Sequence, residues 1–246
     1  MELKETIKKQ SEANLALLLR YYKRGTIVPF IGSGFSANIS GGNKFPQWRT
    51  FLLEYAEQLG IRKMICDMLE DTKISFRYEL AAATIAENDA AFTEKIQDFF
   101  VLNETDTLDP NALVNRLPKI FPQSPIVTSN LDTVIETVYQ NQGVPMGQIL
   151  YGMTFNAQQL KRITSNKDHV LLKIHGCIKD KDTVVFSENQ YSRLYGPLDS
   201  KREYKNKVSK MFPAQFKKMT NEIRFLFLGC SLSEDRYLEI LKQVKE

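Results

Sequence analysis

The sequence predicts an α/β protein built on a doubly wound parallel sheet. Its strand-like segments are short and apolar and lack alternation of apolar and polar residues, which is typical of strands buried on both faces. Helical patterns separate these segments, as they do in parallel sheets, whose strands need long crossover connections. The segments are residues 27–31, 125–128, 170–174 and 223–228. We therefore expect a Rossmann-like sheet with helices on both faces.

The composition excludes several other classes of protein. The chain has 246 residues, 43% of them hydrophobic and 25% charged, so it can bury a sizeable core and is not a disordered chain. No segment approaches the roughly 18 apolar residues of a membrane span, and the start lacks a secretory pattern. Three cysteines (Cys66, Cys177 and Cys230) provide neither a disulfide framework nor a Cys-x-x-Cys zinc pair. We expect a soluble, cytoplasmic, metal-free protein with a single domain over residues 1–246.

The charge is distributed unevenly along the chain. The formal net charge is +4, and a basic protein is a candidate for nucleic-acid binding. However, residues 201–218 hold seven basic residues and one acid, whereas residues 66–110 hold eleven acidic and three basic residues. We interpret the basic segment as a helix with a solvated face, with an anionic ligand or partner as the alternative. The asymmetry suggests assembly, so we expect a homo-oligomer and no direct binding of nucleic acid.

Helical patterns fill most of the first half of the chain. An opening helix ends at Gly25, and a second helix runs from Pro46 to Gly60. Residues 62–117 contain no β-branched run and are predicted to be wholly helical. They form an inserted helical layer in the α/β unit. A further helix is predicted over residues 132–142.

The last third of the chain is predicted to hold one more short strand and two more helices. The strand covers residues 183–186, and Ser187 to Gln190 match a capping box at the start of the next helix, which leads into the basic segment. The final helix is predicted to start at residues 231–234. His169 lies in a charged loop, where we expect it to be solvated.

Small or polar residues follow four of the predicted strands. In open α/β sheets, ligands bind beyond the carboxyl ends of the strands, because loops converge there and helix N-termini point inward. One such strand end is ordinary turn chemistry, but four in succession indicate a site. The four are Gly32–Ser36, Ser129–Asp132, His175-Gly176 and Gly229–Ser231.

The loop after the first strand suits a diphosphate. Gly32 and Gly34 let the backbone approach phosphate oxygens closely, and N–H groups and serine hydroxyls provide donors. Residues 32–37 fit the dinucleotide pattern G-x-G-x-x-A. The acidic residue that ordinary Rossmann dehydrogenases carry about 20 residues later is missing, because residues 46–59 are predicted to be helical. A plain glycine-rich turn is the alternative.

Two other strand ends carry the candidates for catalysis. His175 ends a strand, and the glycine after it leaves space beside the ring. A histidine near its reference pKa is suited to accept a proton at neutral pH; a buried structural histidine is the alternative. Asn130 carries an amide that can orient a water molecule, and it could equally cap a helix.

Taken together, these motifs resemble those of the sirtuin-like NAD-consuming family, especially its bacterial members that hydrolyse NAD in defence against phage. Each motif alone is loose, but the set follows the family's order and spans residues 27 to 232. The motifs are Gly-Ser-Gly-Phe-Ser at 32–36, Phe-Pro-Gln-Trp-Arg at 45–49, Thr-Ser-Asn-Leu-Asp at 128–132, Lys-Ile-His-Gly at 173–176 and Phe-Leu-Gly-Cys-Ser-Leu at 227–232.

The resemblance implies a role for each candidate residue. Asn130 would place the attacking water or the nicotinamide ribose, and His175 would be the general base. The NAD-binding residues that it implies are Gly32, Ser33, Gly34, Phe35 and Ser36 on the diphosphate, Trp48 and Arg49 at the nicotinamide end, Ser129 and Asp132, the latter on the carboxamide, and Gly229 and Ser231 on the adenosine side.

One departure from the family decides between two activities. Protein-deacylating sirtuins carry a four-cysteine zinc module after the catalytic histidine, whereas Cys177 is the sole cysteine between His175 and Val184. The zinc module cannot form, so we expect an NAD glycohydrolase, which cleaves the nicotinamide–ribose bond to give nicotinamide and ADP-ribose and depletes NAD in anti-phage defence. The alternatives are a non-catalytic module that binds NAD or ADP-ribose and regulates a partner, and then a protein deacylase.

Overall fold

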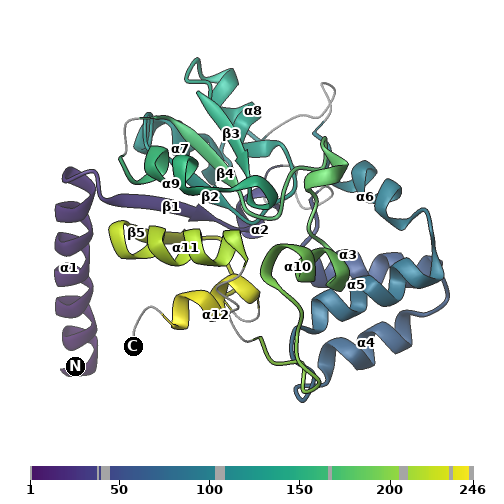
Figure 1. The fold of residues 1–246 in the computed structure, drawn as a ribbon. Helices are drawn as coiled ribbons and strands as arrows, with labels where there is room; N and C mark the ends of the chain where they lie inside the picture. Colours follow the sequence, from purple (N-terminus) through teal and green to yellow (C-terminus); the bar gives the residue numbers. More distant parts are fainter. Residues whose placement is uncertain are drawn as a thin grey trace.

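The computed structural model confirms the α/β class, with a five-stranded sheet whose strands are all parallel (Figure 1). It describes residues 2–37, 39, 45–102, 109–165, 168–204, 210–232 and 235–243. The strands are β1 (Ile27–Ile31), β2 (Ile126–Thr128), β3 (Gln148–Tyr151), β4 (Val170–Lys173) and β5 (Arg224–Leu228), in the spatial order β3-β4-β2-β1-β5. Four of them were predicted. Strand β3 was missed, because this short edge strand buries only Leu150 fully and so lacks the apolar run of the others.

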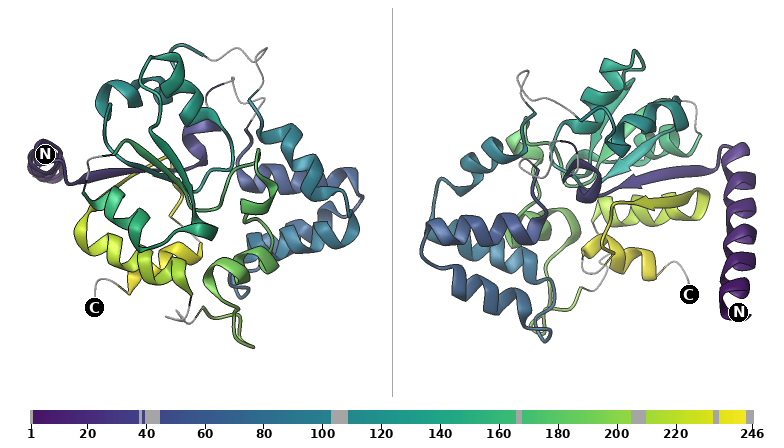
Figure 2. Two further views of the ribbon diagram at one scale, coloured as in Figure 1. Left: turned by 45° about the horizontal axis from the view of Figure 1, so that its top comes forward. Right: turned by 180° about the vertical axis from the view of Figure 1, so that it is seen from behind.

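Helices cover both faces of the sheet, as the doubly wound prediction requires (Figure 2). Because neighbouring residues of a strand point to opposite faces, each strand contributes to two cores. Ile126 and Leu171 pack in one core with helices α7 and α8, whereas Val127 and Leu172 pack in the other with α9, α11 and α12. The bounds are α7 (Leu117–Ile120), α8 (Val134–Asn141), α9 (Ala157–Thr164), α11 (Met211–Glu222) and α12 (Arg236–Lys242).

A group of four helices lies beside the carboxyl ends of the strands (Figure 1). They are α3 (Trp48–Gln58), α4 (Arg62–Glu70), α5 (Arg77–Asn88) and α6 (Phe92–Phe100), with a 3₁₀ helix at Leu113–Arg116 before α7, and α10 (Glu188–Tyr195) packs against α5. The predicted helical layer over 62–117 is thus helical wherever regular structure is described, and residues 103–108 lie outside the described part. The position of these helices makes them one wall of any site at that edge of the sheet.

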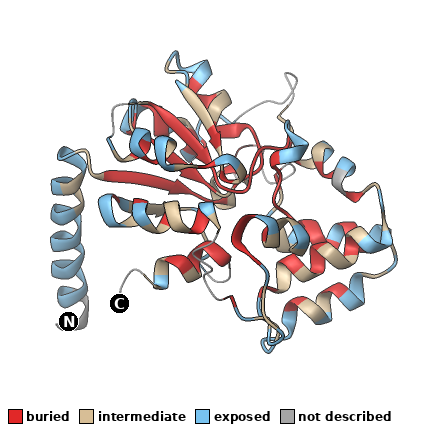
Figure 3. Cartoon of the chain, viewed as in Figure 1, coloured by how far each residue is buried: buried red, intermediate tan, exposed pale blue. Residues whose placement is uncertain are grey.

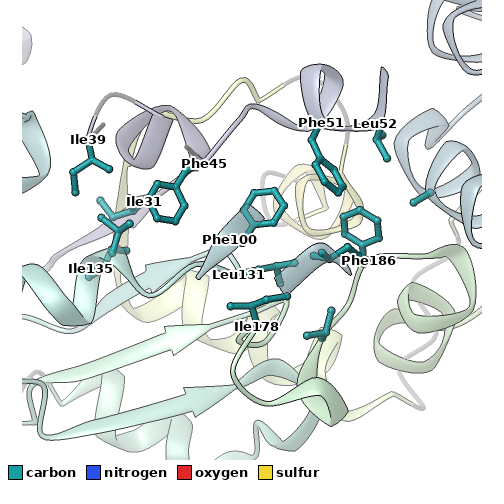
Figure 4. Close-up of a cluster of buried hydrophobic side chains, with 14 of the residues drawn as sticks. Ile31, Ile39, Phe45, Phe51, Leu52, Phe100, Leu131, Ile135, Ile178 and Phe186 are labelled. Carbon is teal, nitrogen blue, oxygen red and sulfur yellow. The ribbon is translucent and has the colours of Figure 1, made fainter. Parts of the chain in front are cut away.

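The core of the helical group is continuous with one core of the sheet (Figure 4). The rings of Phe51 and Phe100 pack edge to face with their centroids 5.2 Å apart. The ring of Phe186, which lies between β4 and α10 in the chain, has its centroid 6.0 Å from that of Phe51. Leu131, directly after β2, and Ile178 belong to the same cluster. This shared apolar contact fixes the helical wall against the strand ends.

Helix α1 (Glu2–Lys23) stands apart from the rest of the chain at the opposite end of the sheet (Figures 1 and 3). Residues 5–17 are all exposed, and only Leu18 and Tyr21 of its last turns are partly buried against the body. Gly25, at a positive φ of 66°, ends the helix as predicted. No helix in the described residues is long and apolar enough to cross a membrane.

Two of the predicted local structures are wrong. Residues 33–37 form a short helix, α2 (Ser33–Ala37), because the turn closes at once with the N–H of Phe35 donating to the carbonyl of Gly32. Residues 183–186 are not a sheet strand. Instead, Lys181–Thr183 form a 3₁₀ turn, and Val185 donates one hydrogen bond to the carbonyl of His175 at 2.8 Å.

The basic segment and His169 also differ from expectation. Only residues from 211 onward are helical, because Gly196 ends α10 at a φ of 105° and the chain then turns through residues 197–204; residues 205–209 lie outside the described part. His169 is buried, with Nδ1 3.2 Å from the carbonyl of Pro145. The capping box from Ser187 to Gln190 is confirmed.

Candidate functional site

A cavity of about 420 Å³ lies at the carboxyl ends of β1, β2 and β5, and helices α3, α5, α10 and α12 complete its wall. Three segments that follow strands reach it: Gly32–Gly34, Ser129–Asn130 and Gly229–Ser231. This is the edge where open α/β sheets bind ligands, and the volume falls within the usual range of small-molecule sites. The cavity is therefore the candidate site.

Most of the predicted site residues line this cavity. Those in its wall are Gly32, Ser33, Gly34, Trp48, Arg49, Ser129, Asn130, Gly229 and Ser231. Those outside the lining are Phe35, Ser36, Asp132 and His175. Phe35, Ser36 and His175 lie one layer behind the wall, where they contact the residues that form it, and Asp132 lies behind Ser36.

The two glycine turns fit against each other so closely that neither tolerates a side chain. A Cβ on Gly32 would lie 2.6 Å from the carbonyl oxygen of Gly229, and one on Gly229 would lie 2.8 Å from the backbone nitrogen of Phe35. The N–H of Gly34 donates to the carbonyl of Gly229 at 3.0 Å, and that of Gly32 donates to Leu228 at 2.9 Å. Because those two N–H groups are already used, they are not the phosphate donors that were predicted, and Ser33 in the cavity lining stays a candidate donor.

Asn130 is held in place by hydroxyl groups. Its backbone N–H donates to Oγ1 of Thr128 at 3.0 Å, and its side-chain amide donates to Oγ of Ser36 at 3.0 Å. The amide is therefore fixed at the cavity wall, and Asn130 is not the cap of α8. Such a fixed amide carbonyl can accept a hydrogen bond from a ligand or a water molecule.

Asp132 lies in a buried polar cluster behind Asn130. Its Oδ1 accepts the N–H of Val134 at 3.0 Å, and burial raises the pKa of its carboxyl while the nearby Lys173 ammonium opposes this rise. Lys173, itself buried, donates to Oε1 of Glu136 at 3.0 Å and to the carbonyl of Asp132. Asp132 thus supports the turn that carries Asn130, and no part of it is in the cavity lining.

His175 is buried directly behind the cavity, with 1% of its surface exposed. Its Nε2 lies 2.9 Å from the hydroxyl of Tyr195, and its Nδ1 lies 3.4 Å from the hydroxyl of Tyr191. Burial lowers the pKa of the imidazole to about 3, although a backbone hydrogen bond at Ser129 opposes the shift. At neutral pH the ring is therefore uncharged, but it holds a proton less readily than the histidine near its reference pKa that was expected from the sequence.

Tyr191 and Asp235 separate His175 from the cavity. Both line the wall; the Tyr191 hydroxyl donates to Oδ2 of Asp235 at 3.4 Å, and Oδ1 of Asp235 lies 3.7 Å from Nε2 of His175. Asp235 also caps helix α12 by accepting the N–H of Tyr237 at 3.2 Å. Burial raises the pKa of the Asp235 carboxyl well above its usual range.

A buried ion pair joins the helical wall to the sheet side of the cavity. Arg236 is fully buried, and its Nε lies 3.0 Å from both carboxylate oxygens of Glu79 on α5, while Nη1 donates to the carbonyl of Gly196. Burial raises the pKa of Glu79 to about 7, opposed by the guanidinium. Since Glu79 lines the cavity, this pair fixes the width of the site.

Trp48 and Arg49 begin helix α3 and line the cavity. The Trp48 ring lies 4.3 Å from that of Phe186, centroid to centroid. Arg49 reaches away to Oε1 of Glu70 at 2.9 Å, with 42% of its side chain exposed. Among the described residues, no group of three or more His, Cys, Asp or Glu side chains is placed to hold a metal ion.

Sequence reasoning missed about half of the cavity wall. The missed residues are Leu52, Phe76, Tyr78, Glu79, Ala82, Phe186, Tyr191, Asp235, Tyr237 and Leu238, whereas Gln47 and Cys230 belong to segments that the sequence already indicated. Two signals were available: the capping box at Ser187 places Tyr191 on the first turns of a helix, and Asp235 precedes the apolar helix α12 as a cap does. Phe76 to Ala82 come from the helical layer, whose docking against the strand ends has no local signature.

One comparison with known proteins identifies the family. The family model described as the SIR2-like domain matches residues 124–246, half of the chain. The match covers Asn130, His175 and the Gly229–Ser231 turn, and the β1 glycine turn and helices α3 to α6 precede it. No curated protein gives a significant match. The arrangement of the strand ends and the matched family agree, and the chain belongs to the sirtuin-like family of SIR2-like domains, which points to an NAD-related activity.

Proposed function

We propose that the protein is an NAD glycohydrolase that cleaves the bond between nicotinamide and ribose and releases nicotinamide and ADP-ribose. The observation that carries the proposal is the pairing of Asn130, fixed at the cavity wall, with a neutral His175 directly behind it. Both lie within the part of the chain that matches the SIR2-like family. The cavity wall also holds the glycine turns, Ser33 and aromatic rings, which are the kinds of group that bind a dinucleotide.

In this proposal each residue has a distinct task. Asn130 orients the attacking water, and His175 takes up the proton that the water loses as its oxygen bonds to the ribose carbon. The bond to nicotinamide breaks with its electron pair moving to the ring, which leaves uncharged. Nicotinamide needs no acid to leave, so one base and a fixed amide suffice.

The proton must reach His175 through the layer that covers it. The Tyr191 hydroxyl lines the cavity and lies 3.4 Å from Nδ1 of His175, so it is the group through which a proton can pass. The Tyr191 hydroxyl relays the proton by donating its own proton to Nδ1 of His175 as it accepts the one that the water loses; burial raises the pKa of this phenol well above its usual range, so it ends the step protonated. Asp132, Phe35 and Ser36 act in this account by supporting Asn130 and the glycine turn.

A second candidate function is a non-catalytic module that binds NAD or ADP-ribose. The burial of His175 favours it, because a base with 1% of its surface exposed does not touch a ligand in the cavity. Deacylation is disfavoured, because the chain between His175 and Val184 contains one cysteine where a zinc module needs four.

The test is a product assay with three possible outcomes. The protein is incubated with NAD, and nicotinamide, ADP-ribose and cyclic ADP-ribose are separated by chromatography, with acetylated peptide present or absent. Release of nicotinamide without peptide supports the hydrolase. If calorimetry shows that NAD binds but no nicotinamide is released under any activating condition tried, the result supports the non-catalytic binding module. Release that depends on the peptide supports the deacylase.

We extend the proposal to the cell by the resemblance to bacterial defence proteins. Uncontrolled hydrolysis would poison a host, so activity in the cytoplasm would be held back until a partner protein, a sensor domain or self-assembly of the chain releases it during phage infection. Expression in bacteria followed by measurement of cellular NAD before and after infection tests this. An unchanged NAD level in infected cells, with an active purified enzyme, would remove the defence role.

A further inference from the structure

The cavity wall brings together aromatic rings and one carboxyl group that, within the described residues, has no guanidinium or ammonium partner. The rings belong to Trp48, Phe76, Tyr78, Phe186, Tyr191 and Tyr237. The carboxylate is that of Asp235, which keeps 18% of its side chain exposed at the wall. Aromatic faces attract cations through the ring quadrupole, and a carboxylate attracts them directly. This combination is the chemistry that recognises a cationic ring.

The other charged groups in the wall are already paired. Glu79 is matched by Arg236, and Arg49 by Glu70. Asp235 has His175 as its ion-pair partner within the described residues, and burial keeps that imidazole uncharged. Asp235 is therefore the acidic group in the described wall that is left to pair with a bound cation.

The groups facing Asp235 come from every element around it. They are His175 after β4, Cys230 after β5, Tyr191 and Tyr195 on α10, Glu79 on α5, and Arg236 and Tyr237 on α12. The three phenols and the imidazole are uncharged at neutral pH, and the Arg236 guanidinium is held by Glu79. None of these groups provides a lasting positive charge that is free to pair with Asp235.

We propose that Asp235 is a specificity-determining residue, which selects a dinucleotide whose nicotinamide ring is cationic over the same dinucleotide with the ring reduced and neutral. The inference rests on the proposed function, in that the ligand is NAD. The oxidised ring carries a positive charge that Asp235 and the aromatic rings stabilise. The reduced ring has the same size but no charge, so the wall gives it no such preference.

Binding of the cation is coupled to the protonation of Asp235. Burial favours the protonated carboxyl in the free protein, and a cation beside it favours the ionised one, so binding lowers the pKa of Asp235. Between the two values, binding of the oxidised form releases a proton, and its affinity rises with pH. Binding of the reduced form releases none at this residue, and its affinity does not follow that rise.

The experiment measures binding and not turnover. The probes are carba-NAD, in which a methylene group replaces the ring oxygen of the nicotinamide ribose so that the bond resists hydrolysis, and its dihydronicotinamide form. Calorimetric titrations from pH 6 to 8, in buffers of different ionisation enthalpy, give the affinity and the number of protons released. We expect about tenfold tighter binding of the oxidised probe, with proton release for that probe alone.

The matched variants separate charge from folding. Asp235→Asn keeps a side chain that caps a helix as well as Asp does but removes the ionisable group. We expect it to abolish the preference and the proton release while the reduced probe binds as before. Asp109→Asn alters a carboxylate that accepts the N–H of Asn111 outside the cavity, and it should change nothing.

Each outcome decides between the two proposals. Equal binding of both probes, or an unchanged preference in Asp235→Asn, overturns the role of Asp235 even if NAD is hydrolysed. A charge preference lost in Asp235→Asn supports that role even if the product assay finds no hydrolysis, in which case only the proposed function fails. If neither probe binds, both the role of Asp235 and the proposed function are overturned.

Discussion

Breaking the ion pair between Glu79 and Arg236 should have unequal effects depending on which partner is removed. The perturbations are Glu79→Leu, Arg236→Met and the double variant, each of which replaces a charged side chain by an apolar one of similar length. The pair is fully buried, and Nε of Arg236 lies 3.0 Å from both oxygens of Glu79. Neither partner can be solvated where it stands.

The asymmetry follows from what each remaining group can do. In Glu79→Leu the guanidinium stays charged, since arginine does not lose its proton, and we expect a loss of about 3–5 kcal/mol in the free energy of unfolding. In Arg236→Met the Glu79 carboxyl can bind a proton, because its pKa is already raised to about 7, so the loss at pH 6 should be about 1–3 kcal/mol. The double variant leaves no buried charge and should lose about 0–2 kcal/mol.

The assay is equilibrium unfolding in urea at pH 6 and pH 8. In Arg236→Met the raised pKa of Glu79 stabilises the fold at low pH, and this contribution is lost as pH rises, by at most about 1.4 kcal/mol per pH unit. The double variant lacks Glu79 and should not show that slope. If the double variant is less stable than Glu79→Leu, or if both single variants lose the same free energy of unfolding at pH 6, this explanation of the ion pair is refuted.

Three further predictions concern Gly229, Trp48 and His175. Gly229→Ala should destabilise the fold by more than the roughly 1 kcal/mol expected of Gly60→Ala. Both glycines have a positive φ, but of the two only Gly229 would bring the added Cβ against backbone, that of Phe35. Equal melting temperatures of the two variants would contradict this prediction. Trp48→Ala should raise KM for NAD about tenfold with a smaller change in kcat, measured by steady-state kinetics, and an unchanged KM would remove Trp48 from the binding surface. Because the pKa of His175 is lowered to about 3, the folded protein binds fewer protons than the unfolded protein, so His175 stabilises the fold above about pH 6.5 and this stability is lost as pH falls toward 3. His175→Gln should therefore flatten the dependence of the urea-unfolding free energy on pH between 6.5 and 5. Parallel pH profiles for the wild type and the variant would contradict the burial of His175.

The parts of the fold that depend on local pattern could be predicted from the sequence. Buried strands such as Val170–Lys173 are continuous apolar runs, and the capping box at Ser187 has a fixed spacing, so both have a local signature. Strand β3 and the turn through residues 197–204 have none, because edge pairing and backbone hydrogen bonds decide them. The extent of the basic helix was therefore overestimated.

The candidate site divides in the same way. The strand-end residues, such as Asn130, could be found because the topology of a parallel sheet brings them to one edge. The exposure of His175 and the contributions of Tyr191 and Glu79 depend on how α10 and α5 dock, which is a tertiary property. Asp132 was expected to touch a ligand, yet it lies beside Lys173, because a buried carboxylate at that turn needs a cation.

The most direct test of the central claim compares the chain's two histidines, both of which are buried. Nicotinamide release from NAD is measured for the wild type, His175→Gln and His169→Gln, with circular dichroism to confirm that each is folded. The account predicts release by the wild type and by His169→Gln, and a loss of at least about a hundredfold in His175→Gln, the usual contribution of a general base. Undiminished release by a folded His175→Gln would contradict it.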